Sequence, residues 1–306
     1  ASAGADLFIN GTTVTFSPPL GSVIQINSSI ADGSYNSLPG NISGNYEPGN
    51  ATHQGAIVVS GPGVVNLAYI NGNSFTGGAT LSGGTLSLSA PFNISDGSQA
   101  TLNLLGGTLA LSFQTGTITN SIVLGGSSTL ETVNSANLFI TGTLTGTGSL
   151  VQAGSGTINI ENSNNSLSGS YILQEGILAL ESTGCLGTAE LRLLGGTLQG
   201  YKSQTLSLTN PINVVADGYI NTNISNITLN GPITGSGDLF ISGGGGFVLT
   251  GTTNTFSGNT YVNGSSLGIT SLGSGTIFLE TDSTLVLQGG EYSNAIHNSA
   301  GEGLQA

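Results

Sequence analysis

A long internal repeat constrains the fold of this chain more than any other feature. Three stretches align from Asn73, Asn165 and Asn254, and each has an apolar residue two positions later and a glycine four positions later. Their starts are separated by 165 − 73 = 92 and 254 − 165 = 89 residues. Self-similarity at such a period is typical of solenoids and other repeat architectures. The repeat anchors are Asn73, Phe75, Gly77, Asn165, Leu167, Gly169, Asn254, Phe256 and Gly258.

Short alternating segments fill the space between these anchors. In residues 101–105 and 205–208, apolar residues alternate with Thr, Ser or Asn, as in half-buried strands, and Gly-containing pairs separate such segments. Strands of this spacing would also fit a sandwich. The head-to-tail repeat favours a solenoid, because a coil takes on the order of 20 residues and one repeat then holds four or five coils. We therefore predict an all-β, right-handed parallel β-helix of roughly 12–15 coils.

The repeat also predicts the organisation of the chain. Residues 1–55 carry only short strands and a Gly-, Asn-, Ser- and Pro-containing stretch, which predicts irregular N-terminal capping coils. Residues 56–306 form the expected solenoid, with repeats starting near 73, 165 and 254 and the last one incomplete. The chain starts at Ala1 without an apolar leader, as expected of an exported protein whose signal peptide has been removed.

Charge excludes several classes of partner. The chain has 15 acidic residues against two basic ones, Arg192 and Lys202, and its formal net charge is −13. Binding to nucleic acid or to an anionic membrane requires clustered Lys and Arg, so neither is expected. No apolar run is long enough to span a bilayer, so membrane insertion by this segment is not expected either. A soluble acidic surface with few trypsin sites favours an extracellular location.

Histidine and cysteine offer little chemistry. His53 and His297 are the only histidines, and neither adjoins a Gly-x-Ser-x-Gly nucleophile turn. The single cysteine, Cys185, rules out an intramolecular disulfide and occupies a position where the next repeat has Ser271. We expect Cys185 to be a small buried side chain, with a reactive thiol as the alternative.

Carboxylate pairs are the remaining catalytic or metal-binding candidates. Glu161 with Glu175, and Glu181 with Glu190, could serve a polysaccharide-acting enzyme, but no such pair recurs in the other repeats. The turn that ends at Asp238 looks like a calcium-binding β-helix turn, yet its counterpart has no carboxylate. The sequence therefore predicts no catalytic site, no metal and no cofactor.

The anchor motifs resemble the autotransporter-associated β-strand repeat found in passenger domains of Gram-negative autotransporters. Residues 254–262 and 271–277 match that pattern, residues 73–86 match it equally well, and residues 165–180 are a weaker copy. The resemblance implies a β-helix on a bacterial cell surface. It does not imply one activity, because members of the family range from adhesins to structural stalks.

These observations lead to one functional expectation with two alternatives. We expect a non-enzymatic extracellular structural or adhesive β-solenoid that associates with itself, head to tail or laterally, into a filament or surface layer. One alternative is an autotransporter-type passenger adhesin that binds glycans or other features of a host or neighbouring cell. The other is a polysaccharide-acting enzyme.

Overall fold

The chain folds into a parallel β-solenoid. The computed structural model describes residues 7–9, 11–32, 54–68, 72–89, 100–133, 135–201, 205–223, 225–251, 253–289 and 292–299. These residues contain strands and turns but no helix, and their parallel strands stack in about 12 turns. The all-β solenoid predicted from the sequence is thus confirmed, with a turn number at the low end of the predicted range. No helix in the described part of the chain is long and apolar enough to cross a membrane.

Alternation along each strand builds the interior. In β10 (Thr108–Leu111), Leu109 and Leu111 are buried while Thr108 and Ala110 lie at the surface. Parallel pairing then places buried side chains beside buried side chains of the next coil. Leu109, for example, lies in register with a buried leucine on each neighbouring strand. Burying one such side chain contributes about 1.5–3 kcal/mol. The core is therefore a set of aliphatic ladders that run from coil to coil.

Glycine is required at the corners where coils approach one another. Gly84 has φ +64°, in the left-handed region, and a Cβ added there would overlap the Gly61 carbonyl oxygen. Gly107 has φ +81°, and an added Cβ would lie 2.6 Å from the Gly84 carbonyl oxygen. The Gly-Gly pairs of the sequence therefore mark corners whose backbone conformation and spacing exclude side chains.

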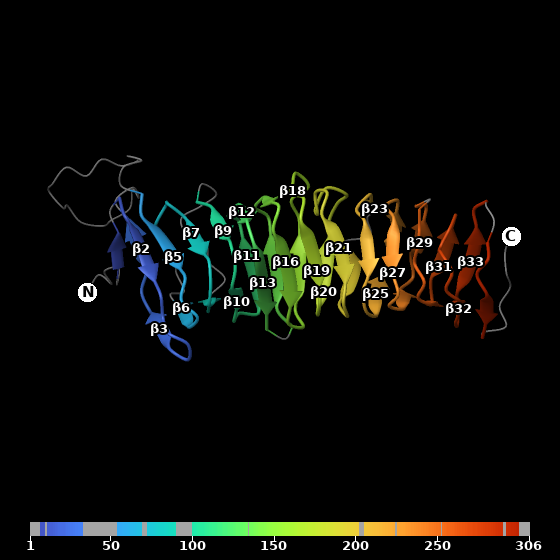
Figure 1. The fold of residues 1–306 in the computed structure, drawn as a ribbon, viewed down its shortest axis with the longest axis horizontal. Helices are drawn as coiled ribbons and strands as arrows, with labels where there is room; N and C mark the ends of the chain where they lie inside the picture. Colours follow the sequence, from blue (N-terminus) through green and yellow to red (C-terminus); the bar gives the residue numbers. More distant parts are fainter. Residues whose placement is uncertain are drawn as a thin grey trace. The chain divides into compact units, whose positions relative to one another are not determined.

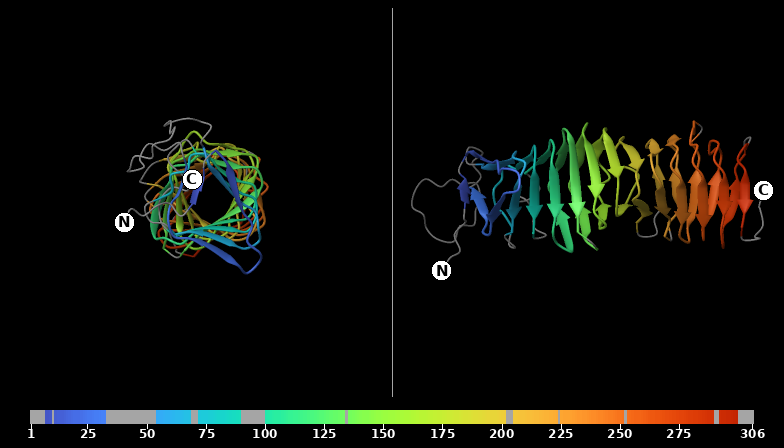
Figure 2. Two further views of the ribbon diagram at one scale, coloured as in Figure 1. Left: turned by 90° about the vertical axis from the view of Figure 1, so that its left-hand side faces the viewer. Right: turned by 60° about the horizontal axis from the view of Figure 1, so that its bottom comes forward.

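The chain divides into two compact units, residues 1–150 and 151–306, and the boundary falls within β16 (Ser149–Ala153). In both units, hydrogen bonds between neighbouring coils join residues about one coil apart. Asn103 and Thr80 are 23 positions apart, whereas Asn263 and Glu280 are 17 apart. Within each unit, successive coils follow the order of the sequence (Figure 1), and in the end-on view the strands of a unit surround its coil interior (Figure 2).

The first unit is built on two main sheets. Strands β2 (Thr13–Phe16) and β3 (Val23–Ile26) lie within the predicted capping segment 1–55. They pair in parallel with β5 (Ala56–Val59) and β6 (Val64–Leu67) of the predicted solenoid. Residues 33–53 lie outside the described residues. The first sheet contains β2 (Thr13–Phe16), β5 (Ala56–Val59), β7 (Ala79–Leu81), β9 (Leu102–Leu104), β12 (Ile122–Leu124) and β15 (Leu144–Gly146). The second contains β3 (Val23–Ile26), β6 (Val64–Leu67), β8 (Thr85–Leu88), β10 and β13 (Ser127–Thr132), while β1 (Leu7–Ile9) pairs with β4 (Ile30–Asp32) and β11 (Thr115–Ile118) with β14 (Asn137–Ile140).

Strands of three main sheets make up the second unit. The long sheet contains β17 (Thr157–Ile160), β20 (Ile177–Leu180), β22 (Thr197–Gly200), β25 (Gly218–Asn221), β28 (Leu239–Ser242), β30 (Thr260–Asn263), β32 (Ile277–Leu279) and β34 (Ile296–Asn298). A second sheet contains β19 (Ser170–Leu173), β21 (Glu190–Leu193), β24 (Ile212–Val214) and β27 (Ile233–Gly235). The third contains β23 (Leu206–Leu208), β26 (Ile227–Leu229), β29 (Gly246–Leu249), β31 (Ser266–Ile269) and β33 (Thr284–Leu287), and β18 (Ser166–Leu167) is a short further strand.

Candidate functional site: ladders of outward side chains

The repeat anchors lie inside the coils or at their corners. The apolar anchors Phe75, Leu167 and Phe256 are all 0% exposed. A Cβ added at the glycine anchor Gly77 would lie 2.6 Å from the Gly55 carbonyl oxygen, and one at Gly258 would overlap the carbonyl oxygen of the adjacent coil. These positions therefore serve packing and close approach of the backbone, and none of them offers a surface to a ligand.

The asparagine anchors join backbones of different coils. The Oδ1 atom of Asn254 accepts a hydrogen bond from the Ile233 amide at 2.9 Å. Its Nδ2 atom donates to the carbonyl oxygens of Gly251 at 2.9 Å and of Ser271 at 2.6 Å. A single amide side chain thus satisfies three backbone groups near a corner, where no strand partner is available. Matching bonds run from Asn165 Nδ2 to the Cys185 carbonyl oxygen and from the Ile30 amide to Asn73 Oδ1.

Three other residues singled out from the sequence, Cys185, Asp238 and His297, each have different neighbours in the structure. Cys185 is fully buried, with its Sγ 3.0 Å from the Ile160 carbonyl oxygen, which confirms the expected small buried side chain. Asp238 accepts a hydrogen bond from the Asn259 amide at 2.8 Å. His297 is an exposed residue of β34, and His53 lies outside the described residues. Among the residues that the structure describes, no three His, Cys, Asp or Glu side chains cluster as a metal site.

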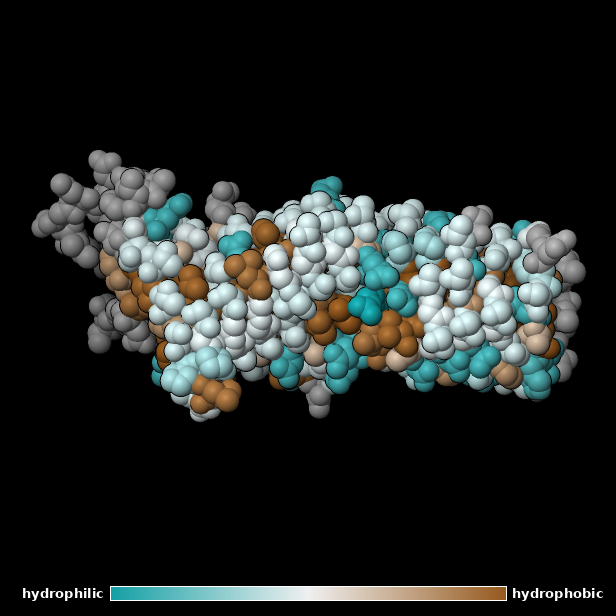
Figure 3. Space-filling model, viewed as in Figure 1, coloured by the Kyte–Doolittle hydropathy of each residue, from teal (hydrophilic) through white to brown (hydrophobic). Residues whose placement is uncertain are grey.

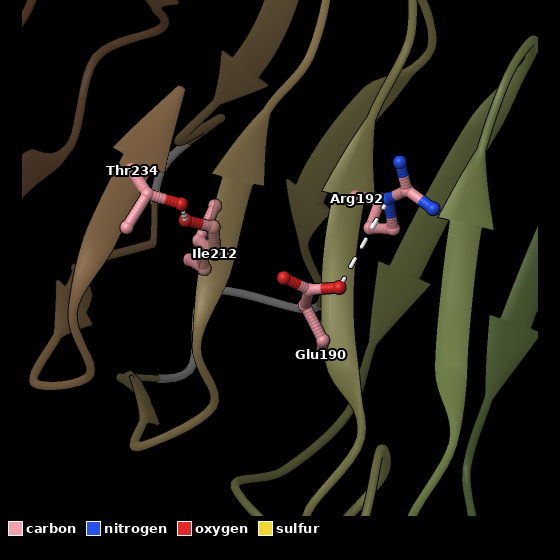
Figure 4. A network of polar contacts seen from close by, with 4 residues as sticks. All are labelled: Glu190, Arg192, Ile212 and Thr234. Carbon is pink, nitrogen blue, oxygen red and sulfur yellow. Dashed lines mark hydrogen bonds and ion pairs between the residues drawn. The ribbon is translucent and has the colours of Figure 1, made fainter.

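The carboxylate candidate Glu190 faces a cation. Its Oε2 lies 3.9 Å from Arg192 Nε on the same strand, β21, and both side chains are more than a third exposed. In Figure 4 this pair lies beside a separate contact, in which the Thr234 hydroxyl donates to the Ile212 carbonyl oxygen at 3.4 Å. An exposed pair of this length contributes little to stability.

Polar side chains on the outer faces form their own ladders. In the first unit, Ser89 Oγ donates to Asn66 Oδ1 at 2.8 Å, and Asn66 Nδ2 donates to Gln25 Oε1 at 2.9 Å. Each bond crosses from one coil to the next. The same pattern joins Ser207, Asn230 and Thr250 in the second unit. The face drawn in Figure 3 is covered mainly by residues of intermediate hydropathy, with hydrophilic groups and several hydrophobic patches among them.

An aromatic row on the long sheet of the second unit is the most distinctive surface feature. It consists of Tyr219, Phe240, Tyr261, Phe278 and His297, one from each of β25, β28, β30, β32 and β34. The ring centroids of the first four are 5.1, 4.8 and 4.7 Å apart, with interplanar angles of 18°, 7° and 7°. The last ring tilts, at 5.5 Å and 42°. We call these five residues the aromatic row.

The geometry of the row follows from the sheet. Parallel strands lie about 4.8 Å apart, and in-register side chains inherit that spacing. Nearly parallel rings at such a centroid distance form stacked pairs, and an offset-stacked pair contributes about 0.5–1.5 kcal/mol. The faces of the rings therefore contact one another, and their edges are turned to solvent. Tyr219, for example, is 39% exposed.

A polar row runs beside the aromatic one, two residues further along each strand. Gln199, Asn221, Ser242 and Asn263 follow one another in register on β22, β25, β28 and β30. Asn263 Nδ2 donates to Glu280 Oε2 at 3.1 Å and so extends the row to the following coil. We call these five residues the amide row. The long sheet thus presents an apolar strip and a hydrogen-bonding strip side by side.

Sequence reasoning missed the aromatic row, although a signal was present. Its first three members recur at 240 − 219 = 21 and 261 − 240 = 21 residues, which is one coil. The longer period of 89–92 residues dominates the sequence, and the spacing of one coil does not stand out within it. A search at the coil period would have aligned Tyr219, Phe240 and Tyr261 directly.

The resemblance to the autotransporter-associated repeat rests on residues whose roles in this fold are now visible. The asparagine, aromatic and glycine positions of that motif each perform a corner or core function in this chain. Such roles support a β-helix of any kind, so they do not distinguish one family from another. Comparison of the chain with protein-family models, curated proteins and solved structures finds no match.

Proposed function

We propose that the chain is a non-enzymatic extracellular structural or adhesive β-solenoid that associates with copies of itself end to end, into a filament or a surface layer. The observation that carries this proposal is the set of outward ladders. Side chains such as Asn66 and Asn230 bond to polar side chains of adjacent coils and form uncharged ladders on the surface. A surface of this kind suits many weak, repeated contacts better than it suits chemistry at one point.

Association through the ends of coils has a simple physical basis. A parallel solenoid leaves an open strand edge at each end of every sheet. The unpaired N–H and C=O groups at such an edge can pair with a strand of another chain. A head-to-tail contact between copies does not close on itself, so it propagates. In the described part of the second unit, β34 is paired on one side, by β32.

Self-association is testable with the purified chain. We expect sedimentation velocity to show species that grow with concentration, and electron microscopy to show fibres of constant width or sheets. Ile296→Glu places a charge at an exposed position of β34 and should reduce assembly, because edge charges oppose strand addition. Ser293→Glu, an exposed position outside the strand, is the control with the same charge change. A chain that stays monomeric at high concentration contradicts the proposal.

The adhesive alternative is favoured by the adjoining aromatic and amide rows. Amide oxygens and nitrogens on Asn221 and Asn263 can bond sugar hydroxyls, and a net charge of −13 disfavours polyanionic glycans. A screen of neutral glycans against the monomeric chain tests this alternative. Binding that is lost in Asn221→Leu but retained in Asn213→Leu, on another sheet, would support it.

A further inference from the structure

The aromatic row presents the edges of several nearly parallel rings in one line. Faces of Phe240, Tyr261 and Phe278 are covered by their neighbours in the row, and the strands that carry them are hydrogen-bonded in register. A ligand therefore cannot insert between the rings without separating those strands. What it can contact is the line of ring edges.

We infer that the aromatic row binds elongated, flat, conjugated molecules of positive charge, which lie along the row across several coils. Ring edges carry partial positive charge and ring faces partial negative charge, so an edge against a face is a favoured aromatic contact. A flat ligand that lies lengthwise on the row makes this contact through the faces of its uncharged rings, while its cationic group, which the positive ring edges would repel, lies over the flanking amide row. This inference goes beyond the proposed structural role and does not depend on self-association.

The surroundings of the row select the charge and the orientation of the ligand. The outward positions of the amide row supply the oxygen atoms of Asn221, Ser242, Asn263 and Glu280 along one flank. The chain as a whole carries a formal charge of −13. A cation is therefore attracted over distance and finds acceptors beside the apolar strip, whereas an anion of the same shape is repelled. Raising the salt concentration should weaken binding by screening this attraction.

Thioflavin T, a flat elongated cation, is a suitable probe. We expect monomeric chain, isolated by gel filtration and verified by sedimentation, to raise its fluorescence several-fold. The double variant Phe240→Thr/Tyr261→Thr interrupts the row with residues that favour strands and should weaken binding by about tenfold or more. Tyr261→Phe keeps a ring at this position and should bind as the parent chain does.

The matched control is Phe139→Thr. Phe139 is an outward aromatic residue of β14 in the first unit, in register with Thr117, and it does not belong to a stacked row in the described residues. Its loss should leave dye binding unchanged. Circular dichroism verifies the fold of each variant, and Tyr219→Thr at the end of the row replaces the double variant if the latter unfolds. Any of three results overturns the inference. The monomer does not raise dye fluorescence, the fluorescence rises only in sedimentable material, or the parent chain and the variants of the aromatic row bind the dye equally.

Discussion

The outward faces of the two units differ although their strands obey one rule. In the first unit, Thr85, Thr108 and Thr129 follow one another in register on β8, β10 and β13. In the second unit, outward positions on the long sheet carry the aromatic row, in which ring centroids are as close as 4.7 Å. Behind both rows lie buried aliphatic side chains in the same alternation. The interior is thus specified by the fold, while the outward row is free to vary, and functional differences belong there.

If the interior is equivalent in both units, removing a buried side chain from either unit should lower the free energy of unfolding by a similar amount. Phe75→Ala in the first unit and Phe256→Ala in the second each remove a ring that is 0% exposed. We expect each to lower the free energy of unfolding by about 3–5 kcal/mol, through lost burial and a residual cavity. Urea unfolding measures the effect, with the surface variant Thr108→Ala as control. A large loss in only one unit would show that the two interiors are not equivalent.

Replacing a corner asparagine should give the next largest loss of stability. Asn254→Ala leaves the Ile233 amide and the carbonyl oxygens of Gly251 and Ser271 without their side-chain partner. We expect a loss of about 2–3 kcal/mol, since unsatisfied buried backbone groups cost about 1–3 kcal/mol and water can reach some of them. Asn213→Ala, at a partly exposed strand position, should cost much less. Equal losses would mean that the corner bonds contribute nothing particular.

A buried hydroxyl in the second unit gives the stability a pH dependence. Tyr171 is fully buried, its hydroxyl donates to Gln152 Oε1 at 2.7 Å, and desolvation raises the pKa of this group well above its usual range. The unfolded chain releases this proton above about pH 10, whereas the folded chain keeps it. Stability due to Tyr171 is therefore complete below about pH 10 and falls above it, by about 1.4 kcal/mol per pH unit.

The variant Tyr171→Phe separates this effect from the other tyrosines. At neutral pH it should cost about 1–2 kcal/mol, because Gln152 Oε1 loses its donor. Between about pH 10 and about pH 11 its stability should fall less steeply than that of the parent chain. Urea midpoints over this range measure both. Parallel pH profiles of the two proteins would assign the alkaline loss to other groups.

The sequence predicts the interior of this molecule better than its surface. The long repeat, together with alternation and glycine pairs, predicts the parallel solenoid, because burial of every second residue and sterically tight corners leave the backbone little choice. The anchors Phe75 and Phe256 are found by the same reasoning. Outward residues carry no such constraint: Thr108 and Tyr261 are equally acceptable to the fold, so periodicity of hydrophobicity does not mark them.

The aromatic row itself was missed for a further physical reason. Stacking depends on strand register, which brings Tyr219, Phe240 and Tyr261 together from positions a whole coil apart. Register follows from corner lengths, and these vary from coil to coil, as the 17 and 23 residue separations show. Spacing alone therefore suggests candidates for a row, and only the paired strands establish which residues touch.

The smallest expected loss of stability tests most directly whether the outward rows of the two units differ. Tyr261→Thr makes the second unit locally like the first and removes two stacked contacts, to Phe240 and to Phe278. We expect a loss of about 1 kcal/mol, because Thr suits a strand and partly offsets the contacts, which contribute about 0.5–1.5 kcal/mol each. Phe139→Thr in the first unit removes an outward ring without a stack and should change the unfolding midpoint less. If the two variants are equally stable, the rings of the row lie in line only because the strands do, and the row is retained for what it binds.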